Sequence, residues 1–171
     1  LAEAARKGHE LHEAIQNYDR FGIASDDERV NNYVELKQGS GLITVENEYL
    51  VSDNEHYASS IDIVMRNVLD EVTLVDIKTT YTLDKEYVSW QLSIYAYLLE
   101  NENPHVKVRS LYAIHIRDGK GKLVEVQRKS VDSVKEVLYG GDIPEYNPYT
   151  MPGKYRDMED EIVRAAHLAK H

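Results

Sequence analysis

Apolar positions follow two different periods along the chain, and the first segment has the period of a helix. Apolar or small residues recur there at spacings of three and four: Ala4, Gly8, Leu11, Ile15 and Tyr18. This pattern predicts an amphipathic helix from Ala2 to about Tyr18. A second, short helix is expected to open at a capping box, Ser25-Asp26-Asp27-Glu28, and to run to about Lys37 before Gly39 and Gly41 stop it.

The next third of the chain has the composition and alternation of strands. Residues Leu42–Val51, Ser59–Arg66 and Val72–Lys78 are rich in β-branched and aromatic side chains. The Asn67–Glu71 link is short enough for a hairpin turn between the second and third of these runs. We therefore expect three consecutive strands.

Helical periodicity returns at about Asp84–Glu100, where one face carries Val88, Leu92, Tyr95 and Leu99. Two further strands, Val108–Arg117 and Lys122–Arg128, are expected as a hairpin around the turn sequence Asp118-Gly119-Lys120-Gly121. A short helix is expected at Val131–Tyr139.

The order of these elements predicts the fold class. It is α/β (α+β), with an αβββαβ core and a mixed sheet flanked by helices. A Gly/Pro/Tyr-rich stretch, Gly140–Gly153, is expected as an irregular arm, followed by a charged helix at about Tyr155–Lys170. No repeat or composition boundary divides the chain, so residues 1–171 are expected to form one domain.

Composition excludes several classes of function. The chain has no cysteine, which rules out disulfides, thiol nucleophiles and cysteine-ligated metal clusters. No apolar run reaches the ~18 residues of a membrane span, and no signal peptide is recognisable, so no membrane partner and a cytoplasmic location are expected.

Net charge narrows the expected partners. The value of −10 argues against broad, non-specific nucleic-acid binding. Basic residues still gather in three places: Arg6 with Lys7, Lys107 with Arg109, and Arg117 with Lys120 and Lys122. Each group is either a solvated surface charge or a phosphate contact, and the composition leaves both open.

Two carboxylates and one ammonium are the candidate catalytic or metal-binding groups of the sequence. Asp62 lies in one strand run, and Asp76 and Lys78 lie in the next. Because strand side chains alternate between faces, Asp76 and Lys78 must share a face, and Asp62 comes near Asp76 if the two strands pair. An exposed Asp–Lys ion pair is the alternative.

Charged groups among aliphatic neighbours are normally paired or bound to a metal. Oxygen ligands of this kind suit Mg²⁺ or Mn²⁺. Attack of an activated water on a phosphodiester is the natural reaction of such a site, with Lys78 orienting the water or offsetting negative charge.

The neighbours of these residues resemble the RecB-like branch of the PD-(D/E)XK nucleases, which includes lambda-type phage exonucleases. The shared elements, in order, are Gly8-His9-Glu10-Leu11-His12, then Asp62, then Asp76-Ile77-Lys78-Thr79-Thr80, and finally Gln91-Leu92-Ser93-Ile94-Tyr95. They span about residues 8–95. Ser59 stands where such chains often have glycine three residues before the strand aspartate. Without cysteine or a P-loop, the branches with an iron–sulfur cluster or a motor in the same chain are excluded.

The resemblance assigns roles to these residues. It implies metal binding by Asp62, Asp76 and the carbonyl of Ile77, with Lys78 as the catalytic lysine. It makes His12 a further metal ligand. His9 is the competing candidate, but it lies about 60° further round the helix. Gly8 is expected to allow a close approach of the helix to the sheet.

The remaining candidates are less determined. Gln91 and Tyr95 are expected to face the site and support it, although Tyr95 also continues the apolar stripe of its helix. Glu46 and Glu48 share a strand face, and either could supply another acid.

The function implied is a metal-dependent DNA nuclease, with an exonuclease of phage-type recombination or DNA end processing as the preferred form. DNA is the expected substrate, and a single-strand annealing protein or a second copy of the chain is an additional possible partner. Two alternatives stay open: a catalytically silent nucleic-acid-binding or assembly module, and an unrelated phosphodiesterase for small substrates.

Overall fold

A mixed five-stranded sheet flanked by four helices forms the part of the chain that the computed structural model describes, residues 2–140. The elements are α1 (Ala2–Phe21), α2 (Glu28–Ser40), β1 (Ile43–Ser52), β2 (Ala58–Arg66), β3 (Val72–Lys78), α3 (Lys85–Glu102), β4 (Val108–Arg117), β5 (Lys120–Val126) and α4 (Val131–Tyr139). The predicted fold class and element order are confirmed. The arm expected after Gly140 and the helix expected at 155–170 lie outside the described residues.

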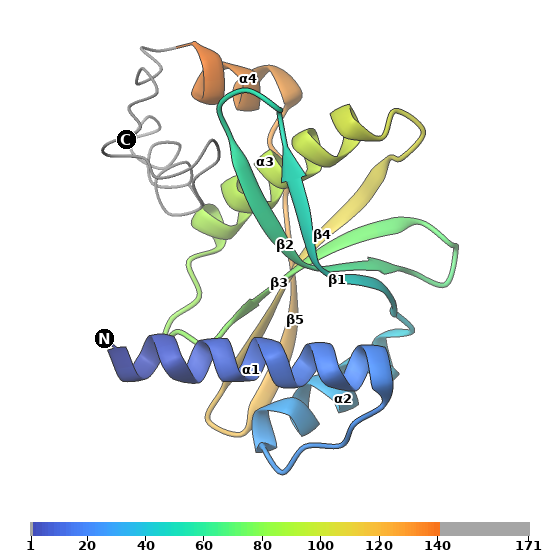
Figure 1. Ribbon diagram of the computed structural model, residues 1–171, viewed down its shortest axis with the longest axis vertical. Coiled ribbons are helices and arrows are strands. Elements are labelled where there is room, and N and C mark those ends of the chain that lie inside the picture. The colour runs from blue at the N-terminus through green and yellow to red at the C-terminus, as the bar shows by residue number, and fades with distance from the viewer. Residues whose placement is uncertain (1, 141–171) are drawn as a thin grey trace.

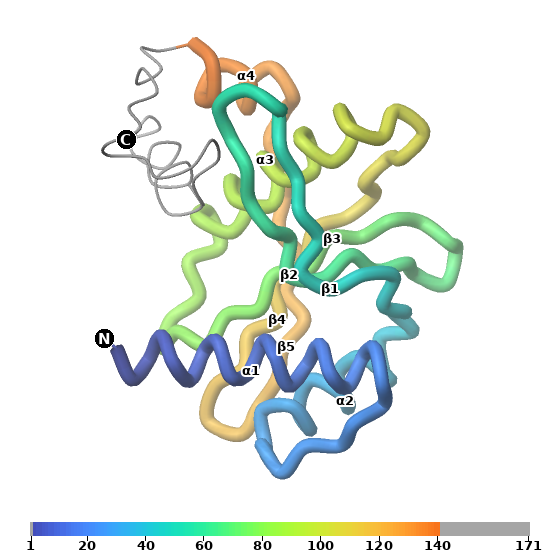
Figure 2. The backbone as a smooth tube through the Cα atoms, in the orientation of Figure 1, coloured from blue at the N-terminus to red at the C-terminus, as the bar shows by residue number. Residues whose placement is uncertain are grey.

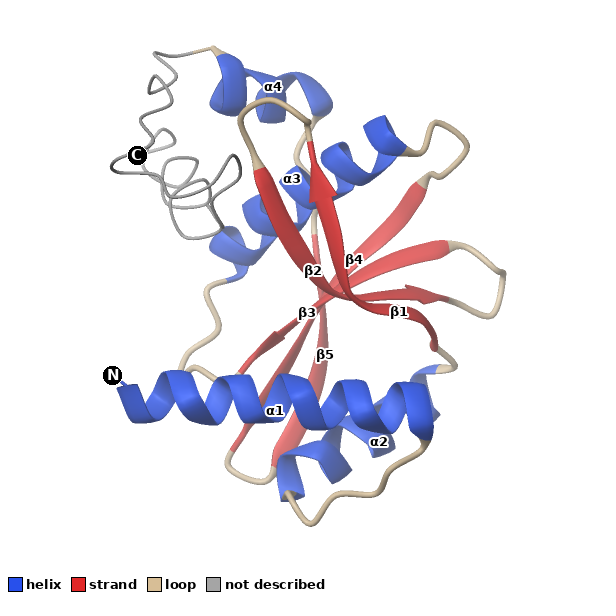
Figure 3. Cartoon of the chain, in the orientation of Figure 1, coloured by secondary structure: helices blue, strands red, loops and turns tan. Residues whose placement is uncertain are grey.

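The strands lie side by side in chain order, β1-β2-β3-β4-β5 (Figure 3). All neighbours are antiparallel except β3 and β4, which are parallel. A parallel pair needs a crossover connection, and α3 provides it. The sheet therefore consists of an antiparallel meander, β1-β2-β3, and a hairpin, β4-β5, which meet at the parallel pair of β3 and β4.

The two faces of the sheet are covered by different helices. Helices α3 and α4 cover one face, which we call the α3 face, and its core includes Leu74, Ala113 and Leu92. Helices α1 and α2 cover part of the other, the α1 face, with Val75 and Leu11 in its core. In Figure 1, α1 and α2 lie together at one end of the molecule, and α3 and α4 lie at the opposite end.

Three predicted boundaries need correction. The N-cap of α2 is Asp27, whose carboxylate accepts from the Arg29 amide, so the helix does not open at Ser25. It continues through Gly39 and ends only at Gly41, whose φ of 72° suits the left-handed C-cap. The β4–β5 turn is the two-residue Asp118-Gly119, with φ of 52° and 71°. This backbone matches the strand twist, and β5 therefore begins earlier than expected.

Strands β1 and β2 both change direction halfway along their length (Figure 2). Their outer halves rise along α3, where Tyr57 of the hairpin donates a hydrogen bond to the carbonyl of Leu138 in α4. Only the inner part of β2, Ile63–Arg66, pairs with β3. The sheet thus divides at Asp62, the first residue of β2 beyond that pairing.

Among residues 2–140, no helix combines the length and apolar character that a bilayer span requires.

Candidate metal centre

The change in direction of β1 and β2 is also a change of face. In β1, the Asn47 side chain donates a hydrogen bond to Asp19 of α1, whereas the partly buried Tyr49 packs against the core of the α3 face. Their partners in β2 behave in the same way: Ile63 lies in the α1-face core and Ile61 in the α3-face core. Residues two apart in a regular strand share a face, so each strand departs from regularity at the residue between.

Those two intervening residues are Glu48 and Asp62. Glu48 has a φ of 50°, in the left-handed region that a residue with a side chain enters only at a cost of about 1–3 kcal/mol. The register places it opposite Asp62. Since neither residue belongs to the core of either face, both carboxylates project where the two halves of the sheet meet.

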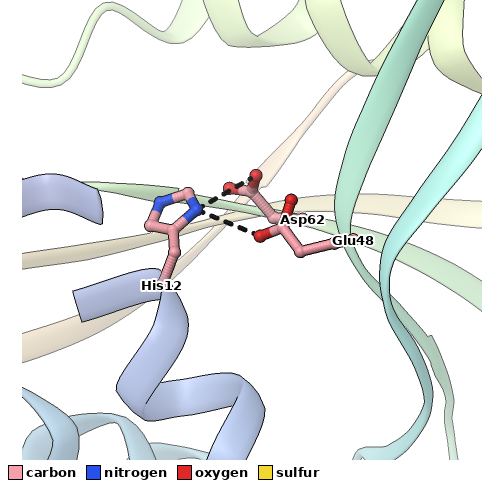
Figure 4. A group of neighbouring side chains, drawn as sticks. All are labelled: His12, Glu48 and Asp62. Carbon is pink, nitrogen blue, oxygen red and sulfur yellow. Dashed lines mark hydrogen bonds and ion pairs between the residues drawn. The ribbon is translucent and has the colours of Figure 1, made fainter. Parts of the chain in front are cut away.

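His12 of α1 completes a three-residue cluster with these acids (Figure 4). Its Nδ1 lies 3.2 Å from Glu48 Oε1 and 3.6 Å from Asp62 Oδ1. One ligand atom from each residue falls within 4.8 Å of the others. Helix α1 can present this imidazole because Leu11 and Ile15 bury its apolar stripe against the sheet, which orients the adjacent face toward the acids.

The acids change the protonation of His12. Burial disfavours a charge on the imidazole, but Glu48, Asp62 and Asp76 together outweigh it and raise the pKa of His12 to about 9. Burial also acts to raise the pKa of Glu48, yet the hydrogen bonds from His12 and from Ser60 Oγ (3.0 Å) lower it below its ordinary value. At neutral pH and without a cation, a protonated His12 therefore faces an ionised Glu48.

Asp62 is the most deeply placed of the three. Its Oδ2 accepts a hydrogen bond from the backbone N–H of Ile77 at 2.7 Å, replacing the strand partner that β3 loses where β2 departs. Burial and then the charge of Asp76 raise the pKa of Asp62 well above its usual range, against the opposing effects of His12 and the Ile77 amide.

Asp76 and Lys78 lie beside the cluster on β3. They share the α3 face of the sheet, as predicted, and Lys78 Nζ is 3.0 Å from Asp76 Oδ2. Asp76 is 2% exposed, and this oxygen accepts no well-formed hydrogen bond from the described residues. The Lys78 ammonium also lies 5.4 Å from the centre of the Tyr87 ring. The alternative of an exposed Asp–Lys pair is therefore wrong.

The donor set fits a divalent cation. Two carboxylates and one imidazole, those of Glu48, Asp62 and His12, meet in a half-buried position, and the charge of the buried Asp76 beside them acts on both His12 and Asp62. Carboxylates suit Mg²⁺ and Mn²⁺, while an imidazole favours transition metals over Mg²⁺. The buried Asp76 carboxylate lies beside this donor set and is paired with the Lys78 ammonium.

The structure distinguishes the candidates that the sequence left open. Glu48 joins the cluster, whereas Glu46 pairs with Arg20 at 2.7 Å. His12 supplies the imidazole, and His9 lines the cleft outside it. The expected role of Gly8 is wrong, because a Cβ built there meets nothing within 4 Å.

A buried polar network supports β1 directly before Glu48. The Asp19 side chain is fully buried and accepts from three groups: Tyr33 Oη at 2.7 Å, Lys37 Nζ at 2.8 Å and Asn47 Nδ2 at 2.9 Å. These bonds join α1, α2 and β1. No local pattern in the sequence indicated this network, since its members come from three separate segments.

Gln91 and Tyr95 are both buried in the α3-face core, at 0% and 1% exposure. The Tyr95 hydroxyl accepts from Gln91 Nε2 at 3.3 Å and from Ser59 Oγ at 3.0 Å. The pair thus contacts β2 through Ser59, three residues before Asp62. Both side chains therefore lie inside the α3 face, and Tyr95 continues the apolar stripe of its helix, as the alternative expected.

The cluster opens into a surface cleft of about 600 Å³. Its lining comes from one face of α1 and from Glu48: Ala5, Gly8, His9, His12, Glu13, Gln16 and Glu48. The cleft gives solvent and ligands access to His12 and Glu48 from the side of α1.

Comparisons with known proteins give no functional identification. No protein-family model and no curated protein matches the chain. A solved structure described as the crystal structure of SSO0001 is similar, with 16% sequence identity and a TM-score of 0.41 over 97% of this chain and 67% of that one. A likeness at this level carries no conclusion about function.

Proposed function

We propose that the protein is a divalent-metal-dependent DNA nuclease. The observation that supports this proposal is that Asp62, Asp76 and Lys78 lie together with His12 where the sheet divides. The motif resemblance assigns these same residues to one site. These residues come from three separate elements. Burying this many charged groups costs free energy unless they are paired or bound to a metal, so a stable core alone does not explain why they meet.

The residues have distinct roles in the proposed reaction. His12, Glu48 and Asp62 would hold the cation, with Asp76 beside them. A bound divalent cation supplies the acidification of a water and the neutralisation of charge on the phosphate. The Lys78 ammonium, fixed by Asp76, would stabilise the negative charge that develops as the phosphodiester is attacked.

The openness of the site favours a polymeric substrate. The cleft beside His12 lies on the surface of α1, and an enclosed pocket would be expected for a small phosphodiester. Within the nuclease class, we propose an exonuclease acting in phage-type recombination or DNA end processing. This step rests on the motif resemblance.

Digestion of end-labelled linear DNA and closed circular DNA, each with Mg²⁺, Mn²⁺ or EDTA, tests the proposal. We expect release of nucleotides or short fragments from linear DNA with either metal, little cutting of circles, and no product in EDTA. An Asp76→Asn variant is the control for contaminating nucleases. Equal cutting of circles would retain the nuclease and overturn the exonuclease form. Tight DNA binding without metal and without product would instead support the silent binding module.

A further inference from the structure

The strand register aligns basic residues in rows across the end of the sheet that carries Lys78. Lys78 of β3 pairs with His115 of β4, and His115 pairs with Lys122 of β5. In the next row, Arg117 pairs with Lys120. We call His115, Arg117, Lys120 and Lys122 the basic strip.

The basic strip projects from the same face of the sheet as Asp76 and Lys78. Ala113 of β4 and Val124 of β5 pack with the α3-face core. Because side chains alternate along a strand, residues two and four positions from these share their face. Arg117, Lys120 and Lys122 are exposed, and His115 is half-buried. The strip therefore starts in the row of Lys78 and continues to the end of the β4–β5 hairpin.

The loop after β3 crosses this strip and is held by it. His115 Nε2 lies 2.6 Å from the carbonyl oxygen of Thr80, and Arg117 donates to the carbonyl of Thr79. These contacts fix the loop that presents Tyr81. The Tyr81 side chain is 79% exposed, although aromatic rings are normally buried, and the Arg117 guanidinium lies 5.4 Å from its ring centre.

Charge makes this arrangement unusual for the chain. The net charge is −10, yet the exposed side chains of the strip are cationic; Asp118 lies 3.8 Å from Arg117, and Glu35 lines a cleft with Lys120 and Lys122. Cations spaced along adjacent strands attract successive phosphates. An exposed ring beside them offers a face for a nucleobase, which can stack there only when it is not already stacked in a duplex.

We infer that the basic strip and Tyr81 bind a single-stranded segment of the DNA substrate, with phosphates on Arg117, Lys120 and Lys122 and an unpaired base on Tyr81. This inference rests on the proposed function and specifies its substrate as a DNA end with an unpaired strand. Lys78 begins the first row of the strip, which places the strip next to the metal centre.

Two charge variants test the phosphate contacts. Lys120→Gln/Lys122→Gln removes two cations from the strip, and Lys107→Gln/Lys135→Gln removes two exposed cations elsewhere, so both carry the same net charge. Binding of a labelled single-stranded oligothymidylate is measured by anisotropy in Ca²⁺ over a range of salt. We expect the strip variant to bind more weakly and the slope of log K against log salt to fall by about 1.4, at about 0.7 per lost contact. The control should keep the wild-type slope.

Two ring variants test stacking in the same assay. Tyr81→Ala should weaken binding roughly 5- to 150-fold, as expected for one lost base–aromatic contact, while Tyr81→Phe should retain the affinity. Tyr81→Ala should weaken the binding of a blunt duplex of the same length less than it weakens the binding of the single strand, because the bases of the duplex are already stacked.

The outcomes separate this inference from the proposed function. If wild-type protein cleaves DNA but both lysine pairs weaken binding equally, or Tyr81→Ala binds like wild type, the inference is overturned and the nuclease stands. If wild-type protein neither binds nor cleaves any DNA with metal, the proposed function fails first.

Discussion

Glu48 and Asp62 stand opposite each other where β1 and β2 both change the face of the sheet that they present. The positive φ of Glu48 is the local irregularity of β1 that accompanies this change. The resulting placement brings both carboxylates to His12 and keeps them out of either core. The strained backbone at Glu48 therefore helps to assemble the candidate site, and strained residues are common at functional sites.

Glycine at position 48 should be more stable than alanine at the same position. Both Glu48→Gly and Glu48→Ala lose the carboxylate, but only glycine adopts a φ of 50° without strain. We expect the glycine variant to exceed the alanine variant by about 1 kcal/mol in free energy of unfolding without metal, measured in urea. Both should lose Mn²⁺ affinity. At a regular strand position the order would be reversed, so a more stable alanine variant would contradict the strained backbone.

Removing the charge of Asp62 should abolish cleavage and stabilise the metal-free protein. The pKa of Asp62 is raised, so its protonated form is favoured in the fold and ionisation destabilises it above the unfolded pKa of about 3.9. Asp62→Asn imitates the protonated form and can still accept from Ile77. We expect a higher melting temperature at neutral pH in EDTA, together with loss of Mn²⁺ binding in calorimetry. A lower melting temperature would show that the ionised carboxylate stabilises the fold.

Loss of Lys78 should separate binding from chemistry. Lys78→Met removes the ammonium next to Asp76 but none of the atoms of the metal cluster. We expect Mn²⁺ affinity within a few-fold of wild type and a cleavage rate lower by about 10²–10³, the usual effect of losing one charge-stabilising group. Near-normal turnover by purified protein would remove Lys78 from the catalytic residues.

The stability of the metal-free protein should depend on pH through His12. Its folded pKa of about 9 exceeds the unfolded value of 6.5, so the contribution is fully present below pH 6.5 and is lost as pH rises through 9. Mn²⁺ must displace the same proton, so its affinity should rise over that interval and binding should release protons. His12→Gln should flatten both dependences and His9→Gln should not. Similar pH profiles for His12→Gln and wild type would contradict the assignment.

Asn47 should position Glu48 for metal binding. Asn47→Ala and Tyr33→Phe each remove one hydrogen bond to Asp19, but only Asn47 adjoins Glu48 in β1. Both variants should be less stable, by about 1 kcal/mol. Loss of a supporting contact typically weakens metal binding about 10- to 100-fold, and we expect this of Asn47→Ala alone, measured with Mn²⁺. Equal Mn²⁺ affinity in the two variants would assign the network a purely structural role.

The sequence by itself determined the order and type of the elements because those depend on local periodicity. Alternation along Val72–Lys78 was sufficient to place Asp76 and Lys78 on one face, and i, i+4 spacing placed Gln91 next to Tyr95. The position of His12 on α1 follows from the same helical geometry, since Leu11 and Ile15 fix which side of the helix is buried.

The tertiary structure decided which acids meet. Glu46 and Glu48 are equivalent in a strict alternation, and only the left-handed backbone at Glu48, with Arg20 holding Glu46, separates them. The Asp19 network joins residues from α1, α2 and β1, and the basic strip exists only because β3, β4 and β5 pair in one register. Such contacts depend on the packing of segments distant in sequence, and the free energy of that packing is not contained in the pattern of any one segment.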